Sequence, residues 1–252
     1  MVDAYRAPGG GVGMFARYAY APNALGYCGP PEPGRLRDGS PAEVRAAAVR
    51  FTGAWPYLRV LSRMTGIADP LDARLVESYW LGGGIGATLD RTAFAAELMA
   101  VIEPLAGHYW NHLTDDLAEE AAPDHCFHVF GIYPWTRLLR VGTGATAVRV
   151  LDSCRITCGL IVAREGPEIV VRSRGLGWDG HRLRLAEPTE RRIAVTIDGY
   201  SAVPDVRPGE VVSLHWDRLC ARLTPRQAAD LSASTARQLD WTNRRLSREQ
   251  AE

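Results

Sequence analysis

Residues 150–162, VLDSCRITCGLIV, mark the point at which the character of this chain changes. The β-branched run predicts a buried strand. The same stretch carries two cysteines four residues apart, Cys154 and Cys158. Free cysteine behaves as a small hydrophobe and is often buried, so packing is the simplest interpretation of both thiols. A ligand role depends on which side chains the fold brings beside this strand.

Downstream of this stretch, short β-branched runs alternate with turn signals such as Asp198-Gly199 and Pro208-Gly209. Five or six short strands in this length predict a small OB-like β-barrel over residues 143–223. Thr224, Pro225 and Gln227 then have the spacing of a helix N-cap, which predicts a C-terminal helix and tail over residues 224–252.

Upstream, residues 14–142 have helical periodicity and predict an N-terminal helical domain. It includes the capping box that begins at Ser40 and a helix that ends at Gly82. Residues 1–13 are rich in glycine and predict a disordered N-terminus, with Met14 as a second candidate start. The expected fold class is therefore α+β: helical domain, OB-like barrel, C-terminal helix.

The composition excludes several classes of function. The formal net charge is zero over 252 residues, so nothing in the charge balance points to nucleic acid or an acidic membrane surface. There is no lysine, which removes Schiff-base chemistry and a P-loop. Five dispersed cysteines and no signal peptide or membrane-spanning apolar run predict a cytoplasmic protein.

Two groups of residues in the helical part could hold a metal. His108 and His112 lie four apart, but the glutamate of a metalloprotease HExxH is replaced by Tyr109, which favours a structural or surface role. A second candidate set matches no zinc-finger spacing, and its default interpretation is burial with hydrogen-bonded histidines. It comprises Cys28, His125, Cys126 and His128.

Cys154 and His215 form the third candidate. A cysteine on the first barrel strand and a histidine on the last can converge if those strands are neighbours. Thiolate and imidazole together suit a borderline transition metal such as iron. Each residue also has a packing interpretation, so the residues alone leave both alternatives open.

Two local motifs resemble the small [NiFe] hydrogenase assembly chaperones of the HypC/HupF type. Residues 154–161, CRITCGLI, resemble the opening C-x-x-x-P-G-x-V/I of that family, with Cys158 in place of the proline. Residues 208–215, PGEVVSLH, resemble its G-D/Q-Y/W-V-L-V-H motif. The whole chain is also similar to an uncharacterised bacterial family that is associated with hydrogenase gene clusters, through ARYAYAPNALGYCGP, VESYWLG, FHVFGIYPW and SLHWDRLCARLTPRQ.

The resemblance implies an OB-like barrel followed by a helix. It also implies that Cys154 and His215 hold the iron of an Fe(CN)₂CO unit transiently, with Cys158 as an auxiliary thiol. The implied partners are a hydrogenase large subunit or other maturation proteins.

Three functions follow from these observations. The first is a non-catalytic, HypC-like assembly factor for [NiFe] hydrogenase. The second is an adaptor that has lost the metal and only docks to a hydrogenase subunit, which the internal position of Cys154 favours. The third is a metalloenzyme with its site in the helical domain. The sequence leans away from an enzyme and does not exclude one.

Overall fold

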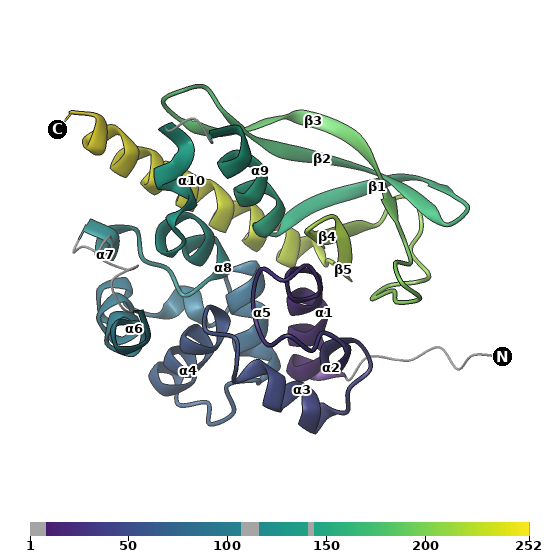
Figure 1. Ribbon diagram of the computed structural model, residues 1–252, viewed down its shortest axis with the longest axis horizontal. Coiled ribbons are helices and arrows are strands. Elements are labelled where there is room, and N and C mark those ends of the chain that lie inside the picture. The colour runs from purple at the N-terminus through teal and green to yellow at the C-terminus, as the bar shows by residue number, and fades with distance from the viewer. Residues whose placement is uncertain (1–8, 107–115, 141–143, 252) are drawn as a thin grey trace.

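A computed structural model of the chain describes residues 9–106, 116–140 and 144–251. The predicted ends at residues 1–8 and 252, His108, His112 and the boundary at 142/143 lie outside the described residues. The structure is a helical layer packed against one antiparallel sheet, so the α+β class is confirmed (Figure 1).

Helices make up the first half of the described chain. Their bounds are α1 Gly10–Ala24, α2 Gly34–Arg37, α3 Pro41–Ala48, α4 Ala54–Thr65, α5 Ala73–Leu81, α6 Arg91–Ala106, α7 Asp116–Glu120, α8 His125–Phe127 and α9 Gly144–Cys154, with 3₁₀ turns at Gly86–Thr88 (η1) and Pro134–Arg140 (η4) and a π-helical turn at His128–Ile132 (η3). The capping box at Ser40 and the left-handed Gly82 that ends α5 are confirmed. Residues 10–13 belong to α1, and Val12 is buried, so the prediction of disorder there is corrected.

Five strands form the second half: β1 Thr157–Glu165, β2 Glu168–Trp178, β3 Leu183–Ala194, β4 Val211–His215 and β5 Arg218–Arg222. Every pairing is antiparallel, in the order β3-β2-β1-β4-β5. The chain ends in α10, Pro225–Ala251, which begins with the predicted Thr224–Gln227 cap.

The sheet differs from the predicted barrel. Among the described residues β3 and β5 are its edges, and no strand pairing joins them, so closure into an OB-like barrel is not confirmed. Two features explain the difference. The β2–β3 hairpin has strands of 11 and 12 residues, whereas β4 and β5 have five each, so the two edges do not match in length. The first predicted strand is also partly helical.

Residues 144–154 form helix α9, so Cys154 ends a helix instead of opening a strand. Ala147, Val150, Leu151 and Cys154 are buried, at the i, i+3, i+4, i+7 spacing of a helix. The β-branched content of residues 148–150 pointed to a strand, but the apolar period of the segment fits a helix, and packing of that face selects the helix.

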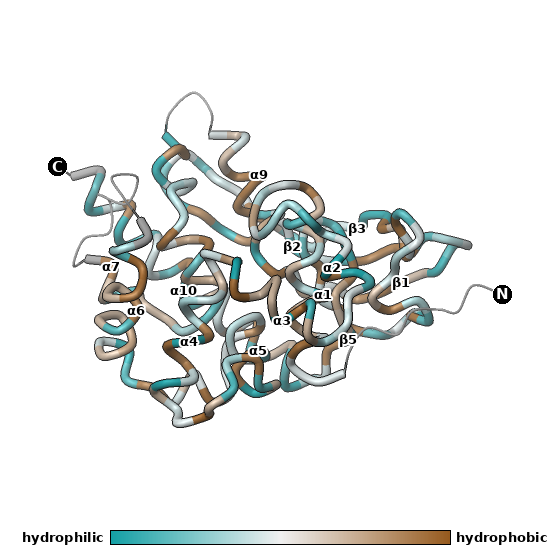
Figure 2. Tube along the Cα trace, turned by 60° about the horizontal axis from the view of Figure 1, so that its bottom comes forward, coloured by the Kyte–Doolittle hydropathy of each residue, from teal (hydrophilic) through white to brown (hydrophobic). Residues whose placement is uncertain are grey.

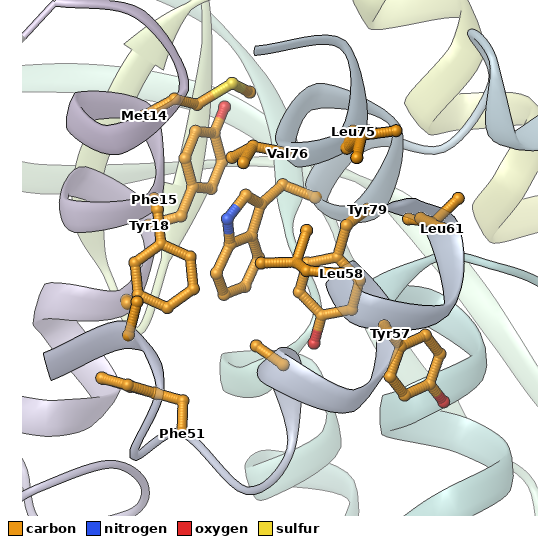
Figure 3. Packing of buried hydrophobic residues seen from close by; sticks show 14 of the residues in the cluster. Met14, Phe15, Tyr18, Phe51, Tyr57, Leu58, Leu61, Leu75, Val76 and Tyr79 are labelled. Atoms are coloured by element: carbon orange, nitrogen blue, oxygen red, sulfur yellow. The ribbon is translucent and has the colours of Figure 1, made fainter. Parts of the chain in front are cut away.

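The helices and the sheet share their cores. One apolar cluster joins Phe15, Tyr57 and Leu58 of the helical layer to Cys220 of β5 and Leu231 of α10. Figure 3 shows side chains of α1, α4 and α5 pointing toward one another in this cluster. In Figure 2 the tube changes repeatedly between brown and teal, so hydrophobic and hydrophilic residues alternate along much of the chain. A second cluster joins α9, β2, β3 and α10.

Helix α10 contacts α5, α7, α8, β1 and β3, so it lies against both layers. Two ionic contacts hold it to the end of α7 and to the segment that follows. Arg245 Nε donates to Glu120 Oε1 at 2.6 Å, and its Nη2 donates to the carbonyl of Phe130. Earlier in α10, Arg237 and Ser234 donate to Asp124, which also caps α8. No helix in the described ranges is both long and apolar enough to cross a membrane.

The buried Arg245–Glu120 pair predicts an unequal response to two substitutions on one helix. Arg245→Ala leaves a buried carboxylate without its cation, and we expect a loss of about 3 to 5 kcal/mol in the free energy of unfolding. Arg248→Ala removes the exposed pair with Glu119 and should cost less than about 1 kcal/mol. Urea unfolding of both variants checks this, and equal losses would contradict the structural role of the buried pair.

Candidate metal site at the helix–sheet interface

Three residues from separate elements meet where the helical layer contacts the sheet. Cys154 ends α9, His215 ends β4 and His125 begins α8. All three are at most 8% exposed. A potential ligand atom of each, the Cys154 sulfur and one ring nitrogen of each histidine, lies within 4.8 Å of the other two. The predicted proximity of Cys154 and His215 is therefore present, and His125 joins them from the other candidate set.

The hairpin between β4 and β5 fixes His215. Trp216 and Asp217 both have positive φ, as a two-residue type I′ turn requires, and His215 pairs with Arg218 across it. His215 Nδ1 donates to the backbone carbonyl of Tyr18 in α1 at 2.7 Å. A carbonyl can only accept, so Nδ1 carries the proton and Nε2 keeps its lone pair.

Nε2 of His215 is buried and has no hydrogen-bond partner among the described residues. A histidine whose Nδ1–H is held by a carbonyl while Nε2 is free has the arrangement usual for a metal ligand. Burial lowers the pKa of His215 to about 4, and the carbonyls of Tyr18 and Cys154 act against that shift. The ring is therefore neutral near pH 7, as ligation requires.

His125 is held by two hydrogen bonds. Its Nε2 lies 3.0 Å from the carbonyl of Cys154, and its Nδ1 lies 3.2 Å from the hydroxyl of Tyr79. The carbonyl again assigns the proton to Nε2, so Nδ1 accepts from Tyr79. Burial, together with His215 and His128, lowers the pKa of His125 well below its usual value. Metal binding at Nδ1 would replace the Tyr79 hydrogen bond.

Cys154 is a neutral thiol in this structure. Burial raises its pKa above the usual range, and the nearby Cys28 thiol raises it further. The guanidinium of the neighbouring Arg155 pairs with Asp152 at 2.7 Å and donates to the carbonyl of Arg174. A buried Cys154 thiolate would therefore need the metal itself as its compensating cation.

The side chains around this group enclose a cavity of about 20 Å³. That volume holds roughly one water molecule or one ion. The residues that line it are Pro22, Cys28, Phe51, Gly53, Ala54, Tyr79, Trp80, His125, His128, Tyr133, Cys154 and His215. Three members of the second candidate set, Cys28, His125 and His128, thus share a cavity with Cys154 and His215, so the two sets predicted separately contribute to one site.

Two predicted residues lie elsewhere. Cys126 faces Thr235 of α10, with 3.6 Å between sulfur and hydroxyl oxygen, and does not line the cavity. Cys158 sits on β1 opposite Ser213 and lines a separate groove of about 410 Å³ beside α10. Neither belongs to the three-residue cluster, so Cys158 is not an auxiliary ligand in this geometry.

Sequence reasoning missed the aromatic wall of the cavity. Tyr79 and Trp80 lie in VESYWLG, and the Trp80 ring is 4.8 Å from the His125 ring and 5.8 Å from the His215 ring, between centroids. Their helical spacing indicated only core packing. The π-helical turn η3 directly follows α8, and Tyr133 at its end lies against His128. Such turns are frequent at functional sites, but a sequence gives little sign of them.

This donor set suits a metal better than covalent catalysis. A nucleophilic cysteine needs a lowered pKa and room for a substrate. Here burial raises the pKa of Cys154, and the cavity holds about one small ion. Two imidazoles and one thiol are instead borderline-soft ligands for a divalent transition metal.

The burial of these thiols predicts their reactivity. In the reduced, metal-free native protein, we expect iodoacetamide to modify Cys158 and Cys28 before Cys126, Cys154 and Cys220, because the first two are partly exposed and the last three are buried. Peptide mass spectrometry after timed quenching measures this order, and denatured protein, in which all five should react, is the control. Modification of Cys154 as fast as Cys158 would contradict the closed cavity.

Comparison with known proteins adds a family but no function. Neither the curated proteins nor the solved structures contain a match to this chain. Residues 7–249 match the family described as "Family of unknown function (DUF6390)". Because that match covers nearly the whole chain, the protein belongs to the DUF6390 family.

Proposed function

We propose that this protein is an assembly factor for [NiFe] hydrogenase that holds iron through Cys154 and His215, with His125 as a third ligand. One observation carries the proposal. The two residues singled out by the HypC-like motifs, although far apart in sequence, have ligand atoms within 4.8 Å of each other and of a ring nitrogen of His125.

The second support is the state of the ligands. Nε2 of His215 is buried without a partner, which is costly unless something fills the position. An ion at the centre of the cluster removes that cost. Cys154 would then supply the thiolate charge, which favours Fe(II) over the oxygen-seeking Mg²⁺ and Ca²⁺.

Three protein ligands also suit a carrier. A three-coordinate protein site leaves positions open for ligands carried with the iron and for a cysteine of the receiving protein. In the proposal the iron and its diatomic ligands are cargo, and the protein performs no bond-making step of its own. A hydrogenase large-subunit precursor would be the receiving partner, in the cytoplasm.

A metal-free adaptor is the second candidate. The complete burial of Cys154, His125 and His215 favours it, because the same side chains can also be read as a closed polar cluster within a core. The third function, a metalloenzyme with a separate site in the helical part, is disfavoured because Cys126 faces Thr235 and not the cavity.

Iron content separates the first two candidates. We expect protein purified without oxygen, from cells that make hydrogenase, to contain iron and to show infrared bands of bound cyanide and CO. Both should vanish in Cys154→Ser and in His215→Ala. Cys126→Ser is the matched control, since this thiol is equally buried but lies outside the cavity, and it should keep the iron.

Capture of a large-subunit precursor is measured in the same preparations. Iron-free wild-type protein that still captures the precursor would establish the adaptor and overturn iron carriage. If the purified protein contains no iron and captures no precursor, the proposed role in hydrogenase assembly is overturned.

A further inference from the structure

The segment between α1 and α2 contributes a fifth potential metal ligand to the cavity, in addition to His125, His128, Cys154 and His215. Residues 24–27 and Gly29 are exposed, yet Cys28 between them is only partly exposed and its side chain lines the cavity. It lies close enough to Cys154 to raise the pKa of that thiol. A loop on the surface thus turns one thiol inward, toward the cluster of His125, Cys154 and His215.

The backbone of this segment is shaped to hold that orientation. Asn23 is buried, and its Nδ2 donates to the carbonyls of Cys28 at 2.8 Å and Pro30 at 2.6 Å. Gly29 has φ of +82°, and a Cβ there would lie 2.4 Å from the ring of Phe51. Only glycine combines that left-handed conformation with such a close approach.

An aromatic contact fastens the exposed side of the segment. The ring of Tyr27 stacks on Trp216 with 3.9 Å between centroids and 24° between planes. Trp216 directly follows His215 in the β4–β5 turn. Tyr27 itself is 52% exposed, so the stack is a surface latch between the loop and the hairpin that carries a ligand.

From this arrangement we propose that Cys28 is the fourth ligand of the site. With the segment closed, Cys28 and Cys154 provide two sulfurs and His125 and His215 provide two nitrogens around one borderline divalent ion such as Fe²⁺, Co²⁺ or Zn²⁺. Each thiol loses its proton to solvent as its bond to the metal forms, and no electron is transferred. Cys28 and His128 both line this cavity and both lie outside the three-residue cluster, so ligation by Cys28 requires its thiol to move toward the other three ligands.

The closed form restricts how cargo could enter the site. Only this opening step rests on the proposed function. A cavity of about 20 Å³ takes a bare ion but not iron with three diatomic ligands. The cargo enters only when residues 24–29 swing away, and Cys28 leaves the metal as they do. A four-ligand resting site thereby becomes the three-ligand carrier.

Metal-bound sulfur can be counted directly. We expect reduced wild-type protein to bind one Co²⁺ with the visible spectrum of a tetrahedral ion and the charge-transfer intensity of two thiolates. X-ray absorption of the Zn²⁺ form should show two sulfur neighbours. Cys28→Ser should retain one metal with one sulfur and bind it about tenfold or more weakly, since loss of even a second-shell partner costs 10- to 100-fold. Cys158→Ser, whose thiol lies outside the cavity, should match the wild type.

The outcomes separate this inference from the function above. One sulfur in both wild type and Cys28→Ser would overturn the role of Cys28 and leave iron carriage by Cys154 and His215 standing. No binding of Co²⁺ or Zn²⁺ by correctly folded wild-type protein would overturn the four-ligand site. A protein that shows two sulfur neighbours but never acquires iron in hydrogenase-producing cells would support the four-ligand site and overturn iron carriage.

The latch gives a second, kinetic readout. Tyr27→Ala should speed the transfer of bound Zn²⁺ to a chromophoric chelator several-fold, with both sulfurs still bound, because it loosens the cover and spares the ligands. Leu25→Ala in the same segment is the control, since Leu25 is similarly exposed and does not stack on Trp216. Equal release rates in the wild type and Tyr27→Ala would show that the segment does not gate the cavity.

Discussion

The contact between α1 and β4 is the constraint on which the rest of this structure depends. Tyr18 makes it twice: its carbonyl accepts from His215 Nδ1, and its hydroxyl bonds Ser213 Oγ at 2.6 Å. The two bonds lie where a helix from the start of the chain meets a strand from its end. They fix the tautomer of His215 and so aim an unprotonated nitrogen at the cavity. Without these two hydrogen bonds, the helical layer and the sheet would not form a common site.

Helix α10 braces the same interface from the other side. The buried carboxylates Glu120 and Asp124 receive Arg245 and Arg237 from it, and Asp124 also caps the turn that presents His125. Burial raises the pKa of Glu120, and Arg245 opposes the shift. Buried ion pairs of this kind contribute little net stability, but they are costly to break. They restrict where the His125 segment can lie, which is what a ligand-holding segment needs.

The chemistry of the cavity follows from the burial of its side chains. Burial raises the pKa values of Cys28 and Cys154 and lowers those of His125, His128 and His215. Every one of these side chains is therefore in its neutral form near pH 7. A low-dielectric cavity lined only by neutral donors contains no formal charge. A divalent cation would bring positive charge, and one or two thiolates formed on binding would compensate it.

Much of the secondary structure was legible in the sequence, because caps and helical periodicity are local. The box at Ser40, the stop at Gly82 and the cap at Thr224 appear as predicted, since each rests on interactions within a few residues. Residues 150–154 were predicted to open a strand, but they end helix α9, whose buried positions repeat at helical spacing. The β-branched content and the helical period of this segment favoured different structures, and packing of its apolar face near η4 and β2 decided between them.

The sequence by itself named the chemically active residues but divided them wrongly. It placed Cys154 and His215 in one group and Cys28, His125, Cys126 and His128 in another, because it assigned the first group to the predicted barrel and the second to the predicted helical domain. Only the tertiary structure decided that Cys28, His125 and His128 share the cavity of Cys154 and His215 while Cys126 turns to α10. The physical reason is that His125 and Cys126 are adjacent on a helical turn, so their side chains point in different directions, and only packing of the two layers determines what each one meets.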